Sequence, residues 1–275
     1  TLRPRRGARG RRGIWFCVNM IETIRAVRRD ENPEFLRRGR IGLEAAALSA
    51  SSAIMDKALI IGASGGIGRA VSEALSARGA AVTGLSRSED GLDVTDESSV
   101  EVGLGRLDGP YDLILVATGA LEIDGARPEK ALKQVTPRSM MDQFALNCIG
   151  PSLVLKHAVR LLPRDVRCVF AALSARVGSI GDNGFGGWYS YRTAKAALNQ
   201  MIHSGAIELR RSHREAICVA LHPGTVQTRF TEKYLGRHPS VPPEEAAQNL
   251  LTVVDGLAPE DSGQFFDWQG ARVPW

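Results

Sequence analysis

The stretch Gly62-Ala63-Ser64-Gly65-Gly66-Ile67-Gly68 decides the fold of this chain. A short apolar run at residues 58–61 precedes it, and apolar residues at helical spacing follow it as far as Gly79. A strand, a glycine-rich turn and a helix in this order form the turn that binds the pyrophosphate of a dinucleotide. The stretch therefore predicts a dinucleotide-binding α/β fold.

Each glycine of the pattern Gly62-x-x-x-Gly66-x-Gly68 has a physical task. Gly62 permits the tight turn, Gly66 lets a pyrophosphate approach the backbone, and Gly68 lets the helix pack close to the strand. The amides at the start of the helix then face the anion. We expect Ser64 and Ile67, which lie between the glycines, to contact the cofactor as well.

Further apolar runs of strand length lie downstream, separated by segments of helix length. The runs span residues 81–85, 113–117, 166–173, 216–221 and 264–268, and the longest helical segments span 140–162 and 191–210. Strands without polar alternation are buried on both faces, which is typical of parallel strands joined by helices. The chain is therefore predicted to form a single doubly wound parallel sheet, a Rossmann fold with helices on both faces.

The composition is that of an ordinary globular protein, with 44% hydrophobic and 24% charged residues in a chain of 275. No run approaches the roughly 18 consecutive apolar residues of a membrane-spanning helix. The four cysteines, Cys17, Cys148, Cys168 and Cys218, have neither the spacing of a disulfide framework nor that of a zinc site. We therefore expect no metal, reduced thiols and a cytoplasmic location.

The net charge of +5 comes from the first 55 residues, which hold 12 Arg, no Lys and 5 acidic residues. The remaining residues hold 23 basic and 25 acidic side chains, which argues against a nucleic-acid-binding core. We predict an Arg-rich extension over residues 1–54 and a Rossmann domain over residues 55–275. The extension is an organellar targeting peptide, a basic arm for nucleic acid, or upstream sequence outside a natural protein that starts at Met55. We favour the last interpretation; a genuine transit peptide would make the location organellar.

The segment Tyr191-Arg192-Thr193-Ala194-Lys195 lies about 125 residues after the glycine turn. On a helix, this spacing of four places the phenol of Tyr191 and the ammonium of Lys195 on one face. A fixed positive charge favours the phenolate and lowers the pKa of a tyrosine from its reference of about 10. We therefore expect Tyr191 to be a general acid and base near neutral pH.

The end of the second predicted strand indicates which dinucleotide binds. A carboxylate there would accept hydrogen bonds from the ribose of NAD, but this chain has Ser86-Arg87. An arginine can pair with the 2′-phosphate of NADP. The nearby carboxylates of Glu89 and Asp90 weaken this argument. The sequence therefore favours NADP(H), with NAD(H) as the alternative.

Asp93 and Val94 follow the second strand where an adenine would lie. The Asp93 carboxylate is placed to accept a hydrogen bond from the exocyclic amine. An Asp before Thr95 is equally a turn or cap residue, so both roles stay open.

In combination, these motifs resemble the short-chain dehydrogenase/reductase family over residues 55–275. The shared features are the glycine turn, an asparagine in the helix at 140–162, a serine after the strand at 166–173, the Tyr-x-x-x-Lys pair and a Pro-Gly after the strand at 216–221. The matching residues are Asn147, Ser174, Tyr191, Lys195, Pro223, Gly224, Val226 and Thr228. The resemblance implies that Asn147 positions a water, that Lys195 also binds the nicotinamide ribose, and that the loop at 223–228 contacts the nicotinamide.

The chain departs from the family pattern in two places. The asparagine-rich segment beside the cofactor is here Ala117-Thr118-Gly119, which keeps small residues but loses amide groups. Ser174 also lies 17 positions before Tyr191, a longer gap than the family's usual one, so Ser179 is a rival for the catalytic serine. We favour Ser174 because it keeps the position at the end of the strand. The extra loop at 180–188 is glycine-rich, and its aromatic residues are candidates for the substrate mouth.

The resemblance implies an enzyme that transfers hydride between NADP(H) and a carbonyl or alcohol substrate. Tyr191 would donate the proton while Ser174 holds the substrate oxygen. The stretch from Ser174 to Ser179 and the ending Trp268…Pro274-Trp275 are most similar to the C-factor-like branch, which contains cell-cell signalling factors as well as reductases. A dinucleotide-binding signalling or regulatory protein with little turnover is therefore the alternative. The resemblance also implies a homodimer or homotetramer.

Overall fold

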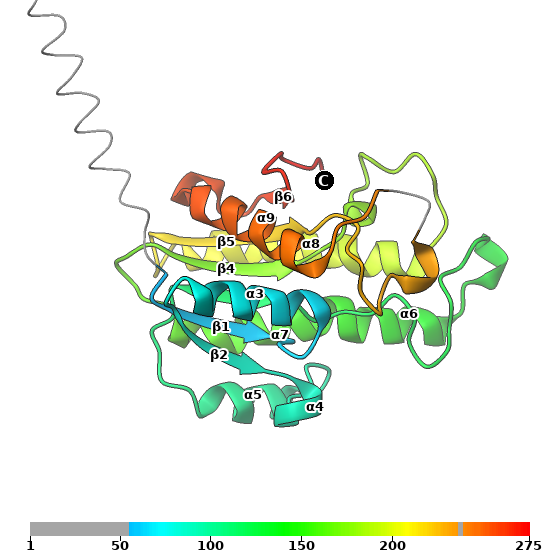
Figure 1. The fold of residues 1–275 in the computed structure, drawn as a ribbon. Coiled ribbons are helices and arrows are strands. Elements are labelled where there is room, and N and C mark those ends of the chain that lie inside the picture. The colour runs from blue at the N-terminus through cyan, green and yellow to red at the C-terminus, as the bar shows by residue number, and fades with distance from the viewer. Residues whose placement is uncertain (1–54, 236–238) are drawn as a thin grey trace, which may run out of the picture. The chain divides into compact units, whose positions relative to one another are not determined.

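The computed structural model describes residues 55–235 and 239–275 (Figure 1). The predicted extension at residues 1–54 lies outside the described residues, so its assignment stays a prediction. The described residues begin just before the first strand of the sheet.

Six parallel strands form one sheet in the order β2-β1-β3-β4-β5-β6. They are β1 Lys57–Ile61, β2 Ala81–Leu85, β3 Leu113–Val116, β4 Cys168–Leu173, β5 Ala216–His222 and β6 Phe265–Asp267. These strands match the apolar runs, which confirms the predicted doubly wound sheet. The chain proceeds from β1 to β2 on one side and then to β3 on the other side of β1. Ligands of such folds bind at this switch point, outside the carboxyl ends of the strands.

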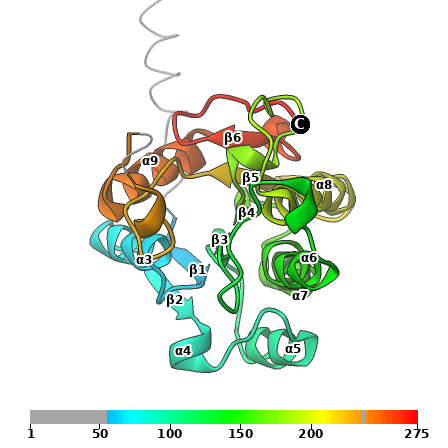
Figure 2. The same cartoon turned by 90° about the vertical axis from the view of Figure 1, so that its right-hand side faces the viewer.

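Helices cover both faces of the sheet (Figure 2). Side chains of α3 and α9 pack on one face, and side chains of α5, α7 and α8 pack on the other. The helices are α3 Gly66–Ala77, α4 Arg87–Asp90, α5 Glu97–Gly105, α6 Pro137–Phe144, α7 Gly150–Ala158, α8 Tyr189–Leu209 and α9 Pro243–Gly256. Short 3₁₀ turns span Leu132–Gln134, Val159–Leu161, Arg176–Gly178, Glu232–Tyr234 and Pro259–Asp261.

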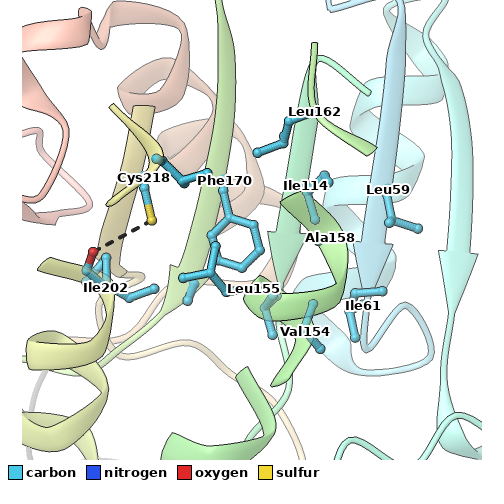
Figure 3. Close-up of a cluster of buried hydrophobic side chains, with 14 of the residues drawn as sticks. Leu59, Ile61, Ile114, Val154, Leu155, Ala158, Leu162, Phe170, Ile202 and Cys218 are labelled. Atoms are coloured by element: carbon cyan, nitrogen blue, oxygen red, sulfur yellow. Dashed lines mark hydrogen bonds between the residues drawn. The ribbon is translucent and has the colours of Figure 1, made fainter. Parts of the chain in front are cut away.

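Burial on both faces explains why the strands are apolar along their length. In the cluster of Figure 3, Leu59, Ile114 and Phe170 of the sheet meet Leu155 of α7 and Ile202 of α8. The alternate strand residues pack against α3 and α9. Full burial of one such side chain contributes about 1.5–3 kcal/mol, so the two clusters hold the carboxyl ends of the strands in a fixed frame.

In place of the helix predicted at 140–162, the chain is helical without a break from Pro137 to Leu161. A π turn, Ala145–Ile149, joins α6 to α7 within this segment. The helical segment begins earlier than predicted because Thr136 caps it: the Thr136 hydroxyl accepts a hydrogen bond from the Ser139 N–H, and Pro137 occupies the first helical position. The apolar spacing did not predict the π turn. This turn contains Asn147, whose side chain is fully buried.

Candidate active site

The glycine turn lies at the switch point between β1 and β3. Gly62 has a φ of +90°, and a Cβ built there would lie 3.0 Å from the carbonyl carbon of Ala117. A Cβ on Gly68 would lie 2.2 Å from the carbonyl oxygen of Gly62. The backbone therefore requires glycine at both positions, as the sequence indicated, and the turn after β3 lies directly beside the turn after β1.

The start of α3 has the character of an anion site. Its N-cap, Gly65, offers no side-chain cap, and the first turn of the helix has no acidic residue. The amides at this end are therefore free of competing carboxylates from the helix itself. Nearby, the Thr118 hydroxyl oxygen is buried without a hydrogen-bond partner among the described residues. Both features fit a phosphate-containing cofactor, and the Ser64 hydroxyl, which accepts a hydrogen bond from Ser88 at 3.0 Å, borders the same turn.

The end of β2 presents both an arginine and a carboxylate. Arg87 is exposed and starts the short helix α4. Asp90 accepts hydrogen bonds from the Ser86 backbone N–H at 2.7 Å and from the Ser86 hydroxyl at 3.3 Å. The carboxylate therefore occupies donors that a 2′-phosphate would otherwise meet, while the guanidinium of Arg87 remains at the surface.

Asp93 and Val94 have local tasks in the fold. One carboxylate oxygen of Asp93 accepts hydrogen bonds from the Thr95 N–H at 2.9 Å and the Thr95 hydroxyl at 2.7 Å. These bonds hold the pKa of Asp93 below its ordinary value. Val94 is buried, and its side chain lies against Gly150 of α7. Asp93 thus acts as a turn residue through its bonds to Thr95. Its contact with adenine stays a prediction.

Asn147 fixes the turn that follows β3. Its amide nitrogen donates to the Ala120 carbonyl at 2.9 Å and to the Gln143 side-chain oxygen at 2.7 Å, and its oxygen accepts from the Ala120 N–H at 3.3 Å. A Cβ on Gly119 would lie 2.8 Å from the same Asn147 oxygen and 3.7 Å from the Lys195 ammonium. The side chain is therefore committed to the backbone beside Lys195, and the water predicted for it stays a prediction.

Tyr191 and Lys195 lie together on the buried face of α8, as their spacing predicted. Tyr191 is 6% exposed and Lys195 is 2% exposed. The Lys195 ammonium donates to the Leu173 carbonyl at the end of β4 at 2.9 Å and lies 5.9 Å from the centre of the Tyr191 ring. The helix thus places an acid and a cation at the carboxyl edge of the sheet, beside the turn after β3.

Burial decides the pKa values of this pair, contrary to the expectation that Lys195 lowers the pKa of Tyr191. Removal from water disfavours the charged form of each group. It raises the pKa of the Tyr191 phenol above its ordinary value and lowers the pKa of Lys195 to about 7. Burial is the cause of the raised pKa of Tyr191, and the Lys195 ammonium donates to the Leu173 carbonyl.

The two candidate serines have different partners. The Ser174 hydroxyl donates to the side-chain oxygen of Asn199 at 2.6 Å. The Ser179 hydroxyl donates to the Pro274 carbonyl and accepts from the Asp182 N–H at 3.0 Å. Ser179 therefore ties its loop to the C-terminal segment, whereas Ser174 bonds to the helix of Tyr191. The choice of Ser174 as the catalytic serine stays a prediction.

The loop after β5 folds back over the glycine turn. A Cβ on Gly66 would lie 2.7 Å from the methyl group of Thr228, and a Cβ on Gly224 would lie 3.0 Å from the Trp268 ring. Val226 is buried and forms an isolated bridge with Val241. The segment that begins at Pro223 thus approaches the glycine turn through Thr228. The contact of this loop with the nicotinamide, which the resemblance implies, stays a prediction.

The start of α8 is held by a residue that the sequence did not single out. Glu129 accepts hydrogen bonds from the Ser190 hydroxyl and, at 3.2 Å, from the Ser190 N–H, and its carbonyl accepts from the Trp188 N–H at 2.6 Å. Trp188 has a φ of 52°, unusual for a bulky residue, and its ring lies 6.4 Å from that of Tyr191. The Phe185 ring, by contrast, is 94% exposed. Of the aromatic loop residues, Trp188 therefore borders Tyr191.

Asn199 is the other residue that the sequence did not single out. It is 2% exposed and lies four residues beyond Lys195, on the face of α8 that holds Tyr191. Only this repeated spacing of four signalled it. Its contact with Ser174 joins residues 25 positions apart, which helical periodicity does not predict.

No helix in the described part of the chain combines the length and apolarity needed to cross a membrane. No group of three or more His, Cys, Asp or Glu side chains in residues 55–235 and 239–275 is arranged to hold a metal ion.

Comparison with known proteins identifies the family. A protein-family model described as enoyl-(acyl carrier protein) reductase matches residues 62–252, a span that includes the glycine turn, Tyr191 and Lys195. The chain belongs to the short-chain dehydrogenase/reductase family. The resemblance found in the sequence is thereby confirmed, and with it membership of a family of oxidoreductases.

Relatives within the family differ in what they are described to do. The C-signal of Myxococcus xanthus is 38% identical over 167 residues, which cover 61% of this chain and 94% of the relative. The 1-hydroxy-2-glutathionyl-2-methyl-3-butene dehydrogenase of Rhodococcus sp. (strain AD45) is 32% identical over 239 residues, which cover 80% of this chain and all of the relative. Among solved structures, an NADPH-bound carbonyl reductase from chicken fatty liver has a TM-score of 0.66 at 22% identity, covering 80% of this chain and 99% of that one.

Proposed function

We propose that the protein is an NADP(H)-dependent oxidoreductase that interconverts a carbonyl compound and the corresponding alcohol. The observation that supports it most is the placement of Tyr191 and Lys195 side by side on α8, at the carboxyl edge of the sheet and beside the switch point. Membership of the short-chain dehydrogenase/reductase family and a dehydrogenase relative matched over its whole length agree with this function.

The residues around the switch point would hold the cofactor. The pyrophosphate would lie on the turn at the start of α3, and the nicotinamide end would lie between the turn after β3 and the loop after β5. The residues proposed for these contacts are Gly62, Ser64, Gly66, Ile67, Gly68, Ser86, Arg87, Asp93, Val94, Ala117, Thr118, Gly119, Tyr191, Lys195, Pro223, Gly224, Val226 and Thr228. When bound, the nicotinamide supplies the hydride.

The protein's own groups manage the proton. Tyr191 donates its phenolic proton to the carbonyl oxygen as negative charge develops there. Ser174 would donate a hydrogen bond to the same oxygen in place of its bond to Asn199. The Lys195 ammonium stabilises the phenolate that remains. Burial of Tyr191 keeps the phenol protonated before the reaction, so the acid is in its reactive form at neutral pH.

Replacement of the tyrosine tests this function. Tyr191→Phe removes one hydroxyl from a buried ring, so the fold and NADPH binding should survive. Turnover should fall by about 10²–10⁴, the usual loss for a general acid. The assay follows NADPH oxidation with a panel of ketones and aldehydes, and NADPH binding is titrated in parallel. Turnover that persists in this variant with a confirmed substrate would contradict the role of Tyr191.

The preference for NADP(H) rests on Arg87, and Asp90 opposes it. Arg87→Ala should reduce the affinity for NADPH more than that for NADH, because a charge-assisted hydrogen bond contributes about 1.5–3 kcal/mol. Asp90→Asn should act in the opposite direction, since it removes a negative charge next to the Ser86 donors. Fluorescence titrations of both cofactors with both variants measure the change. Equal affinities of the unaltered protein for NADPH and NADH would reject the preference.

A signalling or regulatory protein with little turnover is the second candidate, and the C-signal relative favours it. Such a protein would bind the cofactor with the same residues. It would be indicated by tight NADPH binding without turnover on a broad panel of carbonyls and alcohols.

The free thiols of Cys148, Cys168 and Cys218 agree with a reducing compartment, and we propose the cytoplasm for either function.

A further inference from the structure

Trp188, the last residue before α8, has a backbone conformation that bulky residues avoid. Its φ is 52°, and the two residues before it, Gly186 and Gly187, have φ values of 63° and 67°. A non-glycine residue in this left-handed region is strained, and it persists only where neighbouring contacts hold it. Such strain is concentrated at active sites and ligand clamps. The fold therefore maintains the position of the Trp188 side chain against a backbone cost.

Hydrogen bonds on both sides of Trp188 hold this conformation. The Trp188 N–H donates to the Glu129 carbonyl at 2.6 Å, and the Trp188 carbonyl accepts from the Arg192 N–H at 2.8 Å. The Arg192 guanidinium also donates to the carbonyls of Gly187 at 2.9 Å and Val177 at 3.1 Å. The backbone at Trp188 is thus fixed to α8 and to the segment at Glu129, so the direction of the indole is fixed as well.

The indole belongs to a group of aromatic rings around Tyr191. The ring centres of Trp188 and Tyr191 lie 6.4 Å apart at an angle of 67°, and those of Trp188 and Tyr234 lie 5.6 Å apart at 70°. The Phe230 ring lies 6.2 Å from the Tyr191 ring at 57°. Edge-to-face contacts are favourable because the edge of an aromatic ring is positive and its face is negative. These four residues form an aromatic cluster drawn from the loop before α8, from α8 and from the segment after β5.

The aromatic cluster is open to solvent. Tyr191 is buried, but Trp188 and Tyr234 are only partly buried, and Phe230 is 38% exposed. All four residues lie outside the two apolar clusters that pack on the faces of the sheet. An exposed aromatic ring therefore lies beside the proposed acid, where a further ring can pack against it.

Tyr191 also borders a hollow of about 290 Å³ that opens to solvent. Leu121 and Ile123, in the segment after β3, contribute apolar side chains to its lining. The Tyr234 hydroxyl donates to the carboxylate of Glu122, the residue between them, at 2.7 Å. This bond ties the aromatic cluster to the lining of the hollow. Ligand pockets have volumes of roughly 300–1,000 Å³, so the hollow suits a small substrate.

The charged side chains that line the hollow favour neither sign of substrate charge. The lining includes Arg127, Glu129 and Asp142. Glu129 accepts hydrogen bonds from the Ser190 hydroxyl and N–H, and Asp142 pairs with Arg138 at 2.8 Å. One guanidinium among two carboxylates does not favour an anion, and the partners of both carboxylates disfavour a cation. The surroundings therefore suit an uncharged group beside Tyr191.

We propose that Trp188 and Phe230 are specificity-determining residues that bind an uncharged aromatic ring attached to the reacting carbonyl. The substrate class is then aromatic ketones and aldehydes and the corresponding alcohols. The substrate ring packs on the indole and on the Phe230 ring, while the carbonyl oxygen meets the Tyr191 hydroxyl. The inference rests on the proposed oxidoreductase function and adds no step to its chemistry.

A matched pair of ketones tests the proposal. Acetophenone and cyclohexyl methyl ketone carry rings of the same size on the same acetyl group, and only the first ring is aromatic. The ratio of their kcat/KM values with NADPH is measured for each protein, so the intrinsic reactivities of the ketones cancel between variants. Trp188→Leu and Phe230→Leu should each lower the preference for acetophenone by about 2- to 10-fold, the contribution of one aromatic pair. A ratio that stays unchanged in both variants overturns the proposal.

Phe185→Leu is the matched control, because it makes the same change from an aromatic to an aliphatic side chain in the same loop. Phe185 is 94% exposed, so we expect its ratio to match that of the wild-type protein. A loss equal to that of Trp188→Leu would show a general effect of the loop and would overturn the proposal. If Trp188→Leu does not fold, Phe230→Leu decides, because a residue that is 38% exposed contributes little to the core.

A charged substrate provides the competing outcome. Arg127 is exposed and lines the hollow, so it is the group that a substrate carboxylate would meet. 4-Acetylbenzoate is acetophenone with a carboxylate on its ring, and we expect its kcat/KM to be lower than that of acetophenone. A preference for 4-acetylbenzoate that is lost in Arg127→Gln would assign the hollow to anionic substrates and would overturn the proposal.

A readout without turnover keeps the inference separate from the proposed function. The indole N–H signal of Trp188 in an NMR spectrum is identified by its absence in Trp188→Leu. With NADP⁺ bound, so that no ketone is reduced, acetophenone should shift this signal more than cyclohexyl methyl ketone does. A signal that responds to neither ketone overturns the inference, even in an active enzyme. A wild-type protein that lacks turnover on every carbonyl instead rejects the oxidoreductase function, and a shifted indole signal would still support the ring site.

Discussion

Lys195 combines functional value with a cost in stability. Burial lowers its pKa to about 7, against a reference of about 10.4 for a lysine in an unfolded chain. Within residues 55–235 and 239–275 no carboxylate forms an ion pair with it. In the proposed mechanism its ammonium stabilises the phenolate that proton donation leaves on Tyr191. A packed apolar side chain at this position would be more favourable for folding.

Lys195→Met should therefore unfold at a higher temperature while losing turnover. As the pH falls below the unfolded pKa, the unfolded chain takes up the proton first, so the wild-type protein loses stability down to about pH 7. The gain in the variant should be fully present at and below about pH 7 and should shrink as the pH rises toward the unfolded value. Thermal unfolding at several pH values measures it, with Lys130→Met, an exposed lysine, as control. A lower melting temperature at pH 7 would show that the ammonium stabilises the fold.

Replacement of Ser174 and replacement of Ser179 should affect different quantities, kcat for the first and thermal stability for the second. Ser174→Ala should lower kcat by roughly 10²-fold with little effect on NADPH affinity, because it removes the proposed donor to the substrate oxygen. Ser179→Ala should mainly lower the melting temperature, since its hydroxyl joins Asp182 to the Pro274 carbonyl. Steady-state kinetics and thermal unfolding of both variants decide between them. A larger loss of kcat in Ser179→Ala would transfer the catalytic role to Ser179.

At the scale of elements, the turn between β1 and α3 has two glycines with different constraints. A Cβ on Gly68 would meet backbone at 2.2 Å, whereas a Cβ on Gly66 would meet the methyl group of Thr228 at 2.7 Å. A backbone atom cannot move away without shifting the strand and the helix, but a threonine side chain can turn.

Gly68→Ala should therefore destabilise the fold by about 1–3 kcal/mol, the usual cost of overpacking. Gly66→Ala should leave stability closer to that of the wild-type protein and weaken NADPH binding, because the pyrophosphate has to approach the backbone there. Denaturant unfolding and cofactor titration of both variants give the two quantities. Equal losses of stability would show that Thr228 is as immovable as the turn itself.

The sequence predicted those elements whose pattern is local. The strands could be predicted because burial on both faces makes each run continuously apolar, as at residues 58–61 and 113–117. The π turn around Asn147 could not be predicted, since it inserts one extra residue into an otherwise regular helical period. The partners of Ser174 and Ser190, namely Asn199 and Glu129, depend on contacts between distant segments. The raised pKa of Tyr191 depends on burial in the folded chain, which spacing alone does not give.

At the scale of the whole molecule, the long helices of one face expose apolar side chains. Met141 and Ile149 on the segment from α6 to α7, and Met201 and Ile207 on α8, are between 43% and 60% exposed. Residues 56–275 hold 23 basic and 25 acidic side chains, so net charge does not oppose association of two copies. Exposed apolar side chains on adjacent helices are typical of surfaces that pair in symmetric oligomers.

We therefore predict a homodimer or homotetramer that pairs through this helical face. Ile207→Asp should shift the protein toward the monomer, because the pairing would bury an unpartnered carboxylate. Val102→Asp is the matched control: Val102 is 52% exposed, but it lies on α5 rather than on α8. Sedimentation velocity at micromolar concentration measures the state of all three proteins. A monomeric wild-type protein would reject the oligomer, and a shift caused by Val102→Asp alone would move the interface to α5.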